Sequence, residues 1–375
     1  MIAGGPAAAA TGIAAVLAAS VADRPFTRAD LAPAFLRFEQ AFAAGPIDEP
    51  TFRALDRSFD AFTMRAFTGD LAAGRVALLE MASRLEQGRP PTPLERAIGA
   101  LCVDVEPPFV ARGADDAPTL AVRSVVDLEL EGPLELEGRL ELRLEDGRLL
   151  AGPTLSLTLR DLEPVDREAP FPREWLEVPT GDHEVRFTVG RAASLPRRLP
   201  VDDASPPDRR ARIRERLDAI DPNAAPADAI DVCRARADLL ADDPLGLVAA
   251  ALVEPKVRFA REVAAECAAL ERGDDPYRGR TDPHWRTFRL GRTAAPARLF
   301  APATPDDAAR PLLIALHGAG ADENLFFHGY GGGRLLELAR ARGIVVVTPR
   351  TEAVLRNEGT IGDLIDGVRE DHAFD

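Results

Sequence analysis

Apolar residues in the first third of the chain recur every three or four positions, the spacing that places them on one face of a helix. The clearest such stripe is formed by Leu31, Phe35, Phe38 and Phe42. Thr27 and Asp30 stand where a variant of the capping box would begin this helix. The same period continues through residues 51–67 and 70–87, and the second stretch ends at a glycine before several prolines. We therefore expect a helical domain over residues 26–105, with the aromatic side chains packed between helices.

The period then changes to two. From Val125 to Leu144, leucine and valine alternate with charged residues, and the alternation returns at 155–159 and 185–189. Strict alternation is typical of strands with one buried face. Asp146-Gly147 is a good hairpin turn between two of these strands. Residues 106–200 are therefore predicted to form an antiparallel, sandwich-like β domain whose charged face is solvated.

A proline-containing linker begins a third region. Residues 201–276 predict a helical connector, with helices near 209–220, 227–240 and 245–271. From Trp285 the pattern becomes β-like again and predicts two short strands around a turn at Gly291.

Two continuous apolar runs mark the last part of the chain. Pro311–Leu316 and Ile344–Thr348 lack alternation, which favours strands buried on both faces, as in a parallel sheet. Arg334–Arg342 between them reads as a helix, so the segment predicts a βαβ unit. The first run ends at the glycine-rich turn H-G-A-G. Ligands bind at the carboxyl ends of strands in such sheets, and this turn lies at that end.

The string PLLIALHGAGADENLFF, followed later by GIVVVTPR, resembles the third and fourth strands of α/β-hydrolases of the esterase, dienelactone-hydrolase and prolyl-oligopeptidase-like group. In that family the HGxG turn supplies part of the oxyanion hole, whose backbone N–H groups stabilise the charge of a tetrahedral acyl intermediate. The residues that the resemblance implies for the site are Gly318 and Ala319 as oxyanion-hole donors, His317 and Gly320 as supports of the turn, and Tyr330 and Gly331 at the border of the substrate pocket.

The family's nucleophilic serine is not found in this sequence. It would lie on a G-x-S-x-G elbow after the fifth strand, with the acid and the histidine later. The sequence has no such motif and no serine after Ser205. We therefore expect a truncated fragment of a serine hydrolase, inactive by itself, whose apolar third strand has a bare edge that favours aggregation. The alternatives are a non-catalytic binding or scaffolding protein carrying a hydrolase remnant, or an unrelated α/β binding module over residues 277–375.

The fold class predicted from these patterns is multidomain α+β. Its parts are a leader over 1–25, the helical domain over 26–105, the antiparallel β domain over 106–200, the helical connector over 201–276, and a partial α/β-hydrolase domain over 277–375, containing the first part of its parallel sheet. The leader carries no charged side chain before Asp23 and has small residues at Ser20-Val21-Ala22. These features favour an export signal slightly over a cytoplasmic alanine-rich helix, although a basic start is missing.

Composition narrows the range of partners. With 61 acidic and 46 basic residues the chain has a net charge of −15, which argues against nucleic acid and anionic membrane surfaces. No run is long and apolar enough for a spanning helix. Three widely spaced cysteines and five scattered histidines suggest neither a disulfide framework nor a metal site, and we expect no metal and no cofactor. The expected partner is a small ester or peptide substrate, and the sequence leaves the oligomeric state open.

Overall fold

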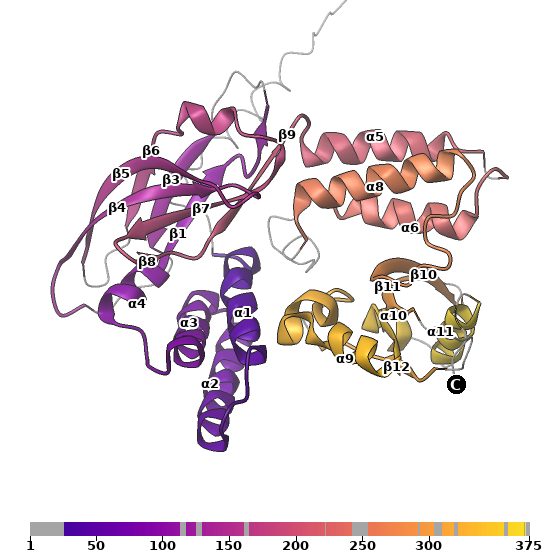
Figure 1. Cartoon of the computed structure of the whole chain (residues 1–375), viewed down its shortest axis with the longest axis horizontal. Coiled ribbons are helices and arrows are strands. Elements are labelled where there is room, and N and C mark those ends of the chain that lie inside the picture. Colours follow the sequence, from indigo (N-terminus) through magenta and orange to yellow (C-terminus); the bar gives the residue numbers. More distant parts are fainter. Residues whose placement is uncertain are drawn as a thin grey trace, which may run out of the picture.

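The computed structural model shows a multidomain α+β protein (Figure 1). N-terminal helices come first, followed by a small antiparallel sheet, a curled mixed sheet, a group of helices and a final mixed sheet. The residues that the structure describes are 26–112, 118–124, 130–160, 165–221, 223–241, 254–291, 293–303, 310–318, 322–355, 359–370 and 372. The predicted leader lies outside them.

The helices expected in the first region are confirmed. They are α1 (Arg28–Ala43), α2 (Glu49–Phe67), α3 (Leu71–Gln87) and α4 (Pro93–Gly99). The backbone N–H of Thr27 donates to Asp30 over 2.8 Å, which is the predicted start of α1. The phenylalanine stripes pack between α1, α2 and α3 in one apolar cluster that includes Phe38 and Phe62. Gly88 ends α3 with a left-handed φ of 67°, a conformation that glycine adopts without steric cost.

Two sheets follow and share one hydrophobic core. The smaller, antiparallel sheet has the order β1 (Leu101–Glu106), β3 (Thr119–Ser124) and β6 (Asp166–Ala169). The larger has the order β2 (Val110–Ala111), β9 (Arg197–Asp202), β7 (Gly181–Val189), β4 (Leu134–Arg143) and β5 (Leu149–Leu159), with β8 (Ala192–Ala193) beside β7. A 3₁₀ turn, η2 (Arg173–Leu176), lies between β6 and β7 and places Trp175 in the core.

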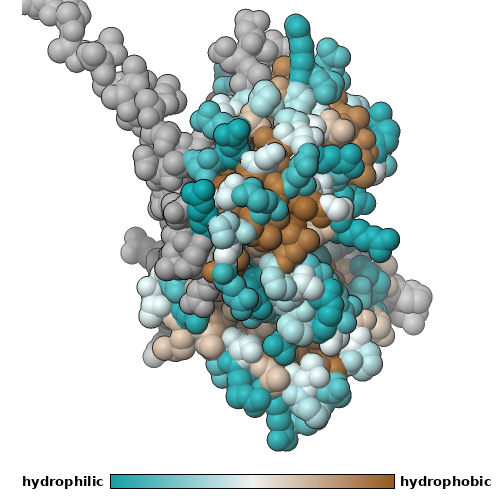
Figure 2. Space-filling view, turned by 90° about the vertical axis from the view of Figure 1, so that its left-hand side faces the viewer, coloured by the Kyte–Doolittle hydropathy of each residue, from teal (hydrophilic) through white to brown (hydrophobic). Residues whose placement is uncertain are grey.

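The predicted alternation is seen in β4, where leucines face the core and charged residues alternate with them. The turn at Asp146-Gly147 joins β4 to β5, with Gly147 at a φ of 88°. Figure 2 views the side on which β4 and β5 lie: hydrophilic side chains cover most of it, and apolar ones gather near its middle. The start of the alternating run, residues 125–129, lies outside the described part.

Two expectations for this region were wrong. The larger sheet is not purely antiparallel, because β2 runs parallel to β9, with Val110 opposite Val201. Alternation reports which face of a strand is buried and carries no information on the direction of its neighbour. The helices also end earlier than residue 105, since β1 begins at Leu101. Its first five residues are all buried, so β1 lacks the alternation by which a strand is recognised.

The connector is helical, as expected. It contains α5 (Pro206–Asp218), α6 (Ala227–Asp238) and α8 (Lys256–Glu271), which pack around their own apolar core. The expected start of the third helix, near residue 245, lies outside the described residues. None of the described helices has the length and apolarity needed to cross a membrane.

The final sheet contains the predicted βαβ unit. Its order is β10 (His284–Leu290), β11 (Thr293–Phe300), β13 (Val345–Pro349) and β12 (Leu312–Ile314). β12 and β13 are parallel, and α9 (Arg334–Arg342) connects them. The other ladders are antiparallel, so the sheet is mixed. Two helices follow, α10 (Thr351–Leu355) and α11 (Thr360–Arg369). β12 is shorter than the apolar run that predicted it and lies at the sheet edge, where Leu313 is 38% exposed.

Candidate functional site

The turn after β12 is held in place by His317, which is buried. Its Nε2 accepts a hydrogen bond from the backbone N–H of Thr351 over 3.0 Å, and its Nδ1 lies 3.0 Å from the carbonyl oxygen of Gly318. An accepting Nε2 requires the proton to be on Nδ1, which donates to that carbonyl. Backbone groups therefore occupy both ring nitrogens, and His317 joins the turn to the start of α10. This arrangement suits a support of the turn and leaves no ring nitrogen to act as a general base.

Gly318 borders open space. A Cβ built on it meets no atom within 4 Å, so the backbone at this position has room on that side. The other two residues of the predicted turn, Ala319 and Gly320, lie outside the described residues. Only the first of the two predicted oxyanion-hole donors therefore has a described position.

A buried polar network begins a few residues after the turn. Glu323 is fully buried, and Arg350 donates to its two carboxylate oxygens over 2.8 and 3.1 Å. The Thr348 hydroxyl donates to the Glu323 carbonyl oxygen over 2.6 Å. Thr348 belongs to β13, and Arg350 is the first residue after that strand. These bonds therefore fix the loop after the turn to the carboxyl end of β13.

The network continues through Arg298 of β11. Its guanidinium lies over the rings of Trp285 and Phe327, 4.8 and 4.9 Å from their centroids. The same group donates to Asn324 over 3.2 Å and to Glu254 over 3.0 Å. Cation–π contact and charge-assisted hydrogen bonds together compensate for burying this cation.

Glu254 has a second neighbour, His328, whose Nε2 lies 2.8 Å from the same carboxylate oxygen. Burial by itself would raise the pKa of Glu254, but the hydrogen bond from His328 and the charge of Arg298 outweigh it. The pKa of Glu254 is therefore well below its usual range. The carboxylate stays ionised and connects the end of the connector to the loop that follows the H-G-A-G turn.

The glycine-rich loop that was predicted to border a substrate pocket packs against α1. It comprises a π-helical turn, η3 (Leu325–Gly329), and a 3₁₀ turn, η4 (Tyr330–Gly333). The ring of Tyr330 meets Phe35 of α1 edge-on at 6.2 Å, and the N–H of Gly331 donates to Glu39 of α1 over 2.7 Å. Burial raises the pKa of Glu39. The predicted border residues are therefore placed in contact with the first described helix.

Three consecutive glycines shape this loop. Gly331, Gly332 and Gly333 have φ values of 58°, 60° and 82°, a run of left-handed residues that side chains with a Cβ would strain. A Cβ at Gly333 would also lie 2.6 Å from the carbonyl oxygen of Phe327. The G-G-G sequence is thus required by the backbone path, independently of any ligand.

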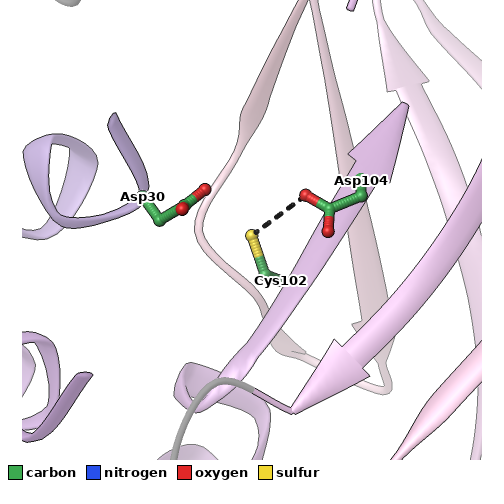
Figure 3. Close-up of side chains that lie close together, drawn as sticks. All are labelled: Asp30, Cys102 and Asp104. Atoms are coloured by element: carbon green, nitrogen blue, oxygen red, sulfur yellow. Dashed lines mark hydrogen bonds between the residues drawn. The ribbon is translucent and has the colours of Figure 1, made fainter. Parts of the chain in front are cut away.

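A second polar cluster joins α1 to the β-sheets (Figure 3). Asp30 of α1 and Cys102 and Asp104 of β1 point toward one another, with one potential ligand atom from each within 4.8 Å of the others. Arg123 donates to Asp104 through Nε, and Arg197 contacts Asp30 over 3.3 Å. Two guanidiniums therefore balance the two carboxylates, and the cluster is better described as a buried charge network than as a cation site.

Comparison with models of known protein families and with curated proteins finds no match to this chain. The resemblance of residues 277–375 to α/β-hydrolases therefore rests on the H-G-A-G motif and the pattern around it. Sequence reasoning missed Glu254, Arg298 and Arg350, because a lone charge beside apolar positions looks solvent-facing. The sequence offered one local sign of a buried polar network. Three consecutive polar residues, D-E-N, begin two positions after the H-G-A-G motif, and all three are buried.

Proposed function

We propose that residues 277–375 are part of an α/β-hydrolase domain of the serine-hydrolase type, which acts on carboxylic esters or peptides. The observation that carries this proposal is the parallel pair β12 and β13, joined by α9, with the glycine-rich turn directly after β12. In parallel sheets the carboxyl ends of strands are where substrates bind. In this proposal the two sheets with a common core form the sandwich-like domain that precedes the catalytic one.

The chemistry proposed for the turn is stabilisation of an oxyanion. The N–H of Gly318, together with that of Ala319, would donate to the oxygen that becomes negative in the tetrahedral intermediate. Removing one such donor from an enzyme typically lowers kcat about 10²- to 10³-fold. The open space beside Gly318 and the fixed position of His317 support this role. The sequence holds no G-x-S-x-G elbow, so the proposal assigns anion stabilisation, and not nucleophilic attack, to these residues.

The first test is to sequence the source DNA across codon 375 and translate it further in all frames. The proposal expects a G-x-S-x-G elbow followed by an acidic residue and a histidine. The longer product should then hydrolyse p-nitrophenyl butyrate and react with a fluorophosphonate probe. If no such elbow is encoded, the serine-hydrolase proposal fails, and a non-catalytic binding or scaffolding role becomes the better explanation.

The second test isolates Gly318 in that longer product. Gly318→Pro removes the backbone N–H and should lower kcat about 10²-fold or more. Gly318→Ala keeps the N–H, and its Cβ meets nothing within 4 Å, so it should retain most of the activity. Thermal unfolding of both variants distinguishes loss of the donor from loss of the fold. Equal activity of the proline and alanine variants would contradict the oxyanion role.

A further inference from the structure

A cavity of about 140 Å³ lies between α3, α4 and the turn from β7 to β8, formed by residues that are not part of the proposed hydrolase site. Its apolar wall includes Leu79 of α3 and Leu195, and its polar wall includes Ser83 and Arg191. An engineered protein cavity of roughly 150 Å³ accommodates a benzene molecule. The space therefore suits an apolar body of about six carbon atoms.

Most charges of the lining are already neutralised by ion pairs. These are Arg37 with Glu86 at 2.6 Å, Arg96 with Glu80 at 3.2 Å, and Glu95 with Arg89 at 2.7 Å. The hydrogen bonds from Arg89 and from the backbone of Thr92 lower the pKa of Glu95 to about 2, so its charge is retained and compensated. Arg37, Glu80, Glu95 and Arg96 of the lining therefore each already have an oppositely charged partner.

Arg191 differs from the other cations of the cavity. It lies exposed at the rim, directly after Gly190 in the tight turn between β7 and β8. Within the described part of the chain no carboxylate is in ion-pair distance of its guanidinium. The cavity therefore has one uncompensated positive charge at its opening. The Ser83 hydroxyl, whose hydrogen bond to the Arg89 carbonyl is long at 3.5 Å, is a second polar group in the lining.

We propose that this cavity binds a small monocarboxylate with an apolar body of about six carbons, the class to which hexanoate and benzoate belong. The carboxylate pairs with the Arg191 guanidinium, whose planar fork matches two carboxylate oxygens. The carbon body lies against Leu79 and Leu195. Because Arg191 contributes one unpaired positive charge, the cavity should bind a monoanion more tightly than a neutral ligand. Because part of the wall is apolar, it should bind an anion with a carbon body more tightly than an inorganic anion.

Isothermal titration calorimetry of the full chain with hexanoate and with benzoate tests the proposal. Both should show saturable binding. Benzamide, which has the body without the charge, should bind at least about tenfold more weakly, because a charge-assisted hydrogen bond is lost. Inorganic phosphate, which has the charge without the body, should not bind. Absence of saturable binding by both carboxylates, or equal affinity for benzamide or phosphate, would overturn the proposal.

Two variants separate this cavity from other surfaces. Arg191→Gln should weaken hexanoate binding about tenfold or more, whereas Arg65→Gln, at an exposed arginine of α2, makes the same change in net charge and should leave it unchanged. Ala193→Phe, at an exposed position of the lining, should fill the space and abolish binding. Because Arg191 and Ala193 are exposed, neither Arg191→Gln nor Ala193→Phe should change the free energy of unfolding of the ligand-free protein. Unchanged affinity in Arg191→Gln would place the ligand elsewhere.

Discussion

Acid should destabilise the final sheet through two buried histidines. His284 begins β10 and is 2% exposed, and His372, after α11, is 7% exposed. Their ring centroids are 6.3 Å apart. The Nδ1 of His284 lies 2.8 Å from the Asp282 carbonyl oxygen, and neither ring's Nε2 has a hydrogen-bond partner among the residues that the structure describes. Burial lowers the pKa of His284 to about 3. Burial, with the charges of Arg310 and Arg286, lowers that of His372 to about 4.

The sign of the effect follows from linkage. A histidine in the unfolded chain has a pKa near 6.5, above both folded values, so the unfolded state binds more protons between pH 6.5 and 4. The stabilisation is complete above pH 6.5 and is lost as the pH falls toward the folded values. Each pKa unit is worth about 1.4 kcal/mol. Lowering the pH from 7 to 5 should therefore reduce the free energy of unfolding by about 2 kcal/mol for His284 and about 1–2 kcal/mol for His372.

Urea-induced unfolding at pH 7, 6 and 5 measures this loss. Fluorescence reports on the relevant sheet, because Trp285 is next to His284 in β10. The double variant His284→Gln and His372→Gln removes both titrating rings and should flatten the pH dependence over this interval. Each single variant should remove its own share. The reasoning fails if the double variant keeps the same slope of stability against pH as the unmodified chain.

Three further changes have defined outcomes. Asp30→Ala removes the cap of α1 and one carboxylate of a buried charge network. It should lower the free energy of unfolding, measured by urea titration, by about 3–5 kcal/mol. A loss as small as that of a surface ion pair would contradict this. Gly138→Ala places a Cβ 2.4 Å from the Phe187 ring and should cost about 1–3 kcal/mol, whereas Gly132→Ala, with nothing within 4 Å, should cost far less. Leu313→Lys at the edge strand β12 should reduce self-association in light scattering, and undiminished association would show that another surface is responsible.

Elements specified by neighbouring residues were the ones predictable from the sequence. The helix Arg334–Arg342 and the turn at Asp146-Gly147 depend on local spacing and local backbone preference, and both stand where the pattern placed them. The strand β1 could not be predicted in this way, because both of its faces are buried by elements distant in sequence. The direction of β2 likewise depends on β9, whose pairing residues lie about ninety positions away.

The same division applies to the candidate site. The H-G-A-G motif could be found because it follows an apolar run directly, and its first residue, His317, makes hydrogen bonds that suit a support. Ala319 and Gly320 lie outside the described residues, so the oxyanion role of the turn stays a prediction. The network around Arg298 could not be inferred from the sequence. Its partner Glu254 is 44 residues away, and an arginine between apolar strand residues suggests a solvated side chain. Its burial depends on two aromatic rings that arrive from different elements.

The position of α1 has a consequence for how the chain reaches its native state during synthesis. Asp30 contacts Arg197, which is 167 residues later, and Glu39 bonds Gly331, which is 292 residues later. At roughly 5–20 residues per second, a ribosome needs about 15–60 s to translate that longer interval. For this time the apolar stripe of α1 has no final partner in the last domain. Such long-range contacts slow folding, so a nascent chain of this protein should depend on chaperones more than one dominated by local contacts.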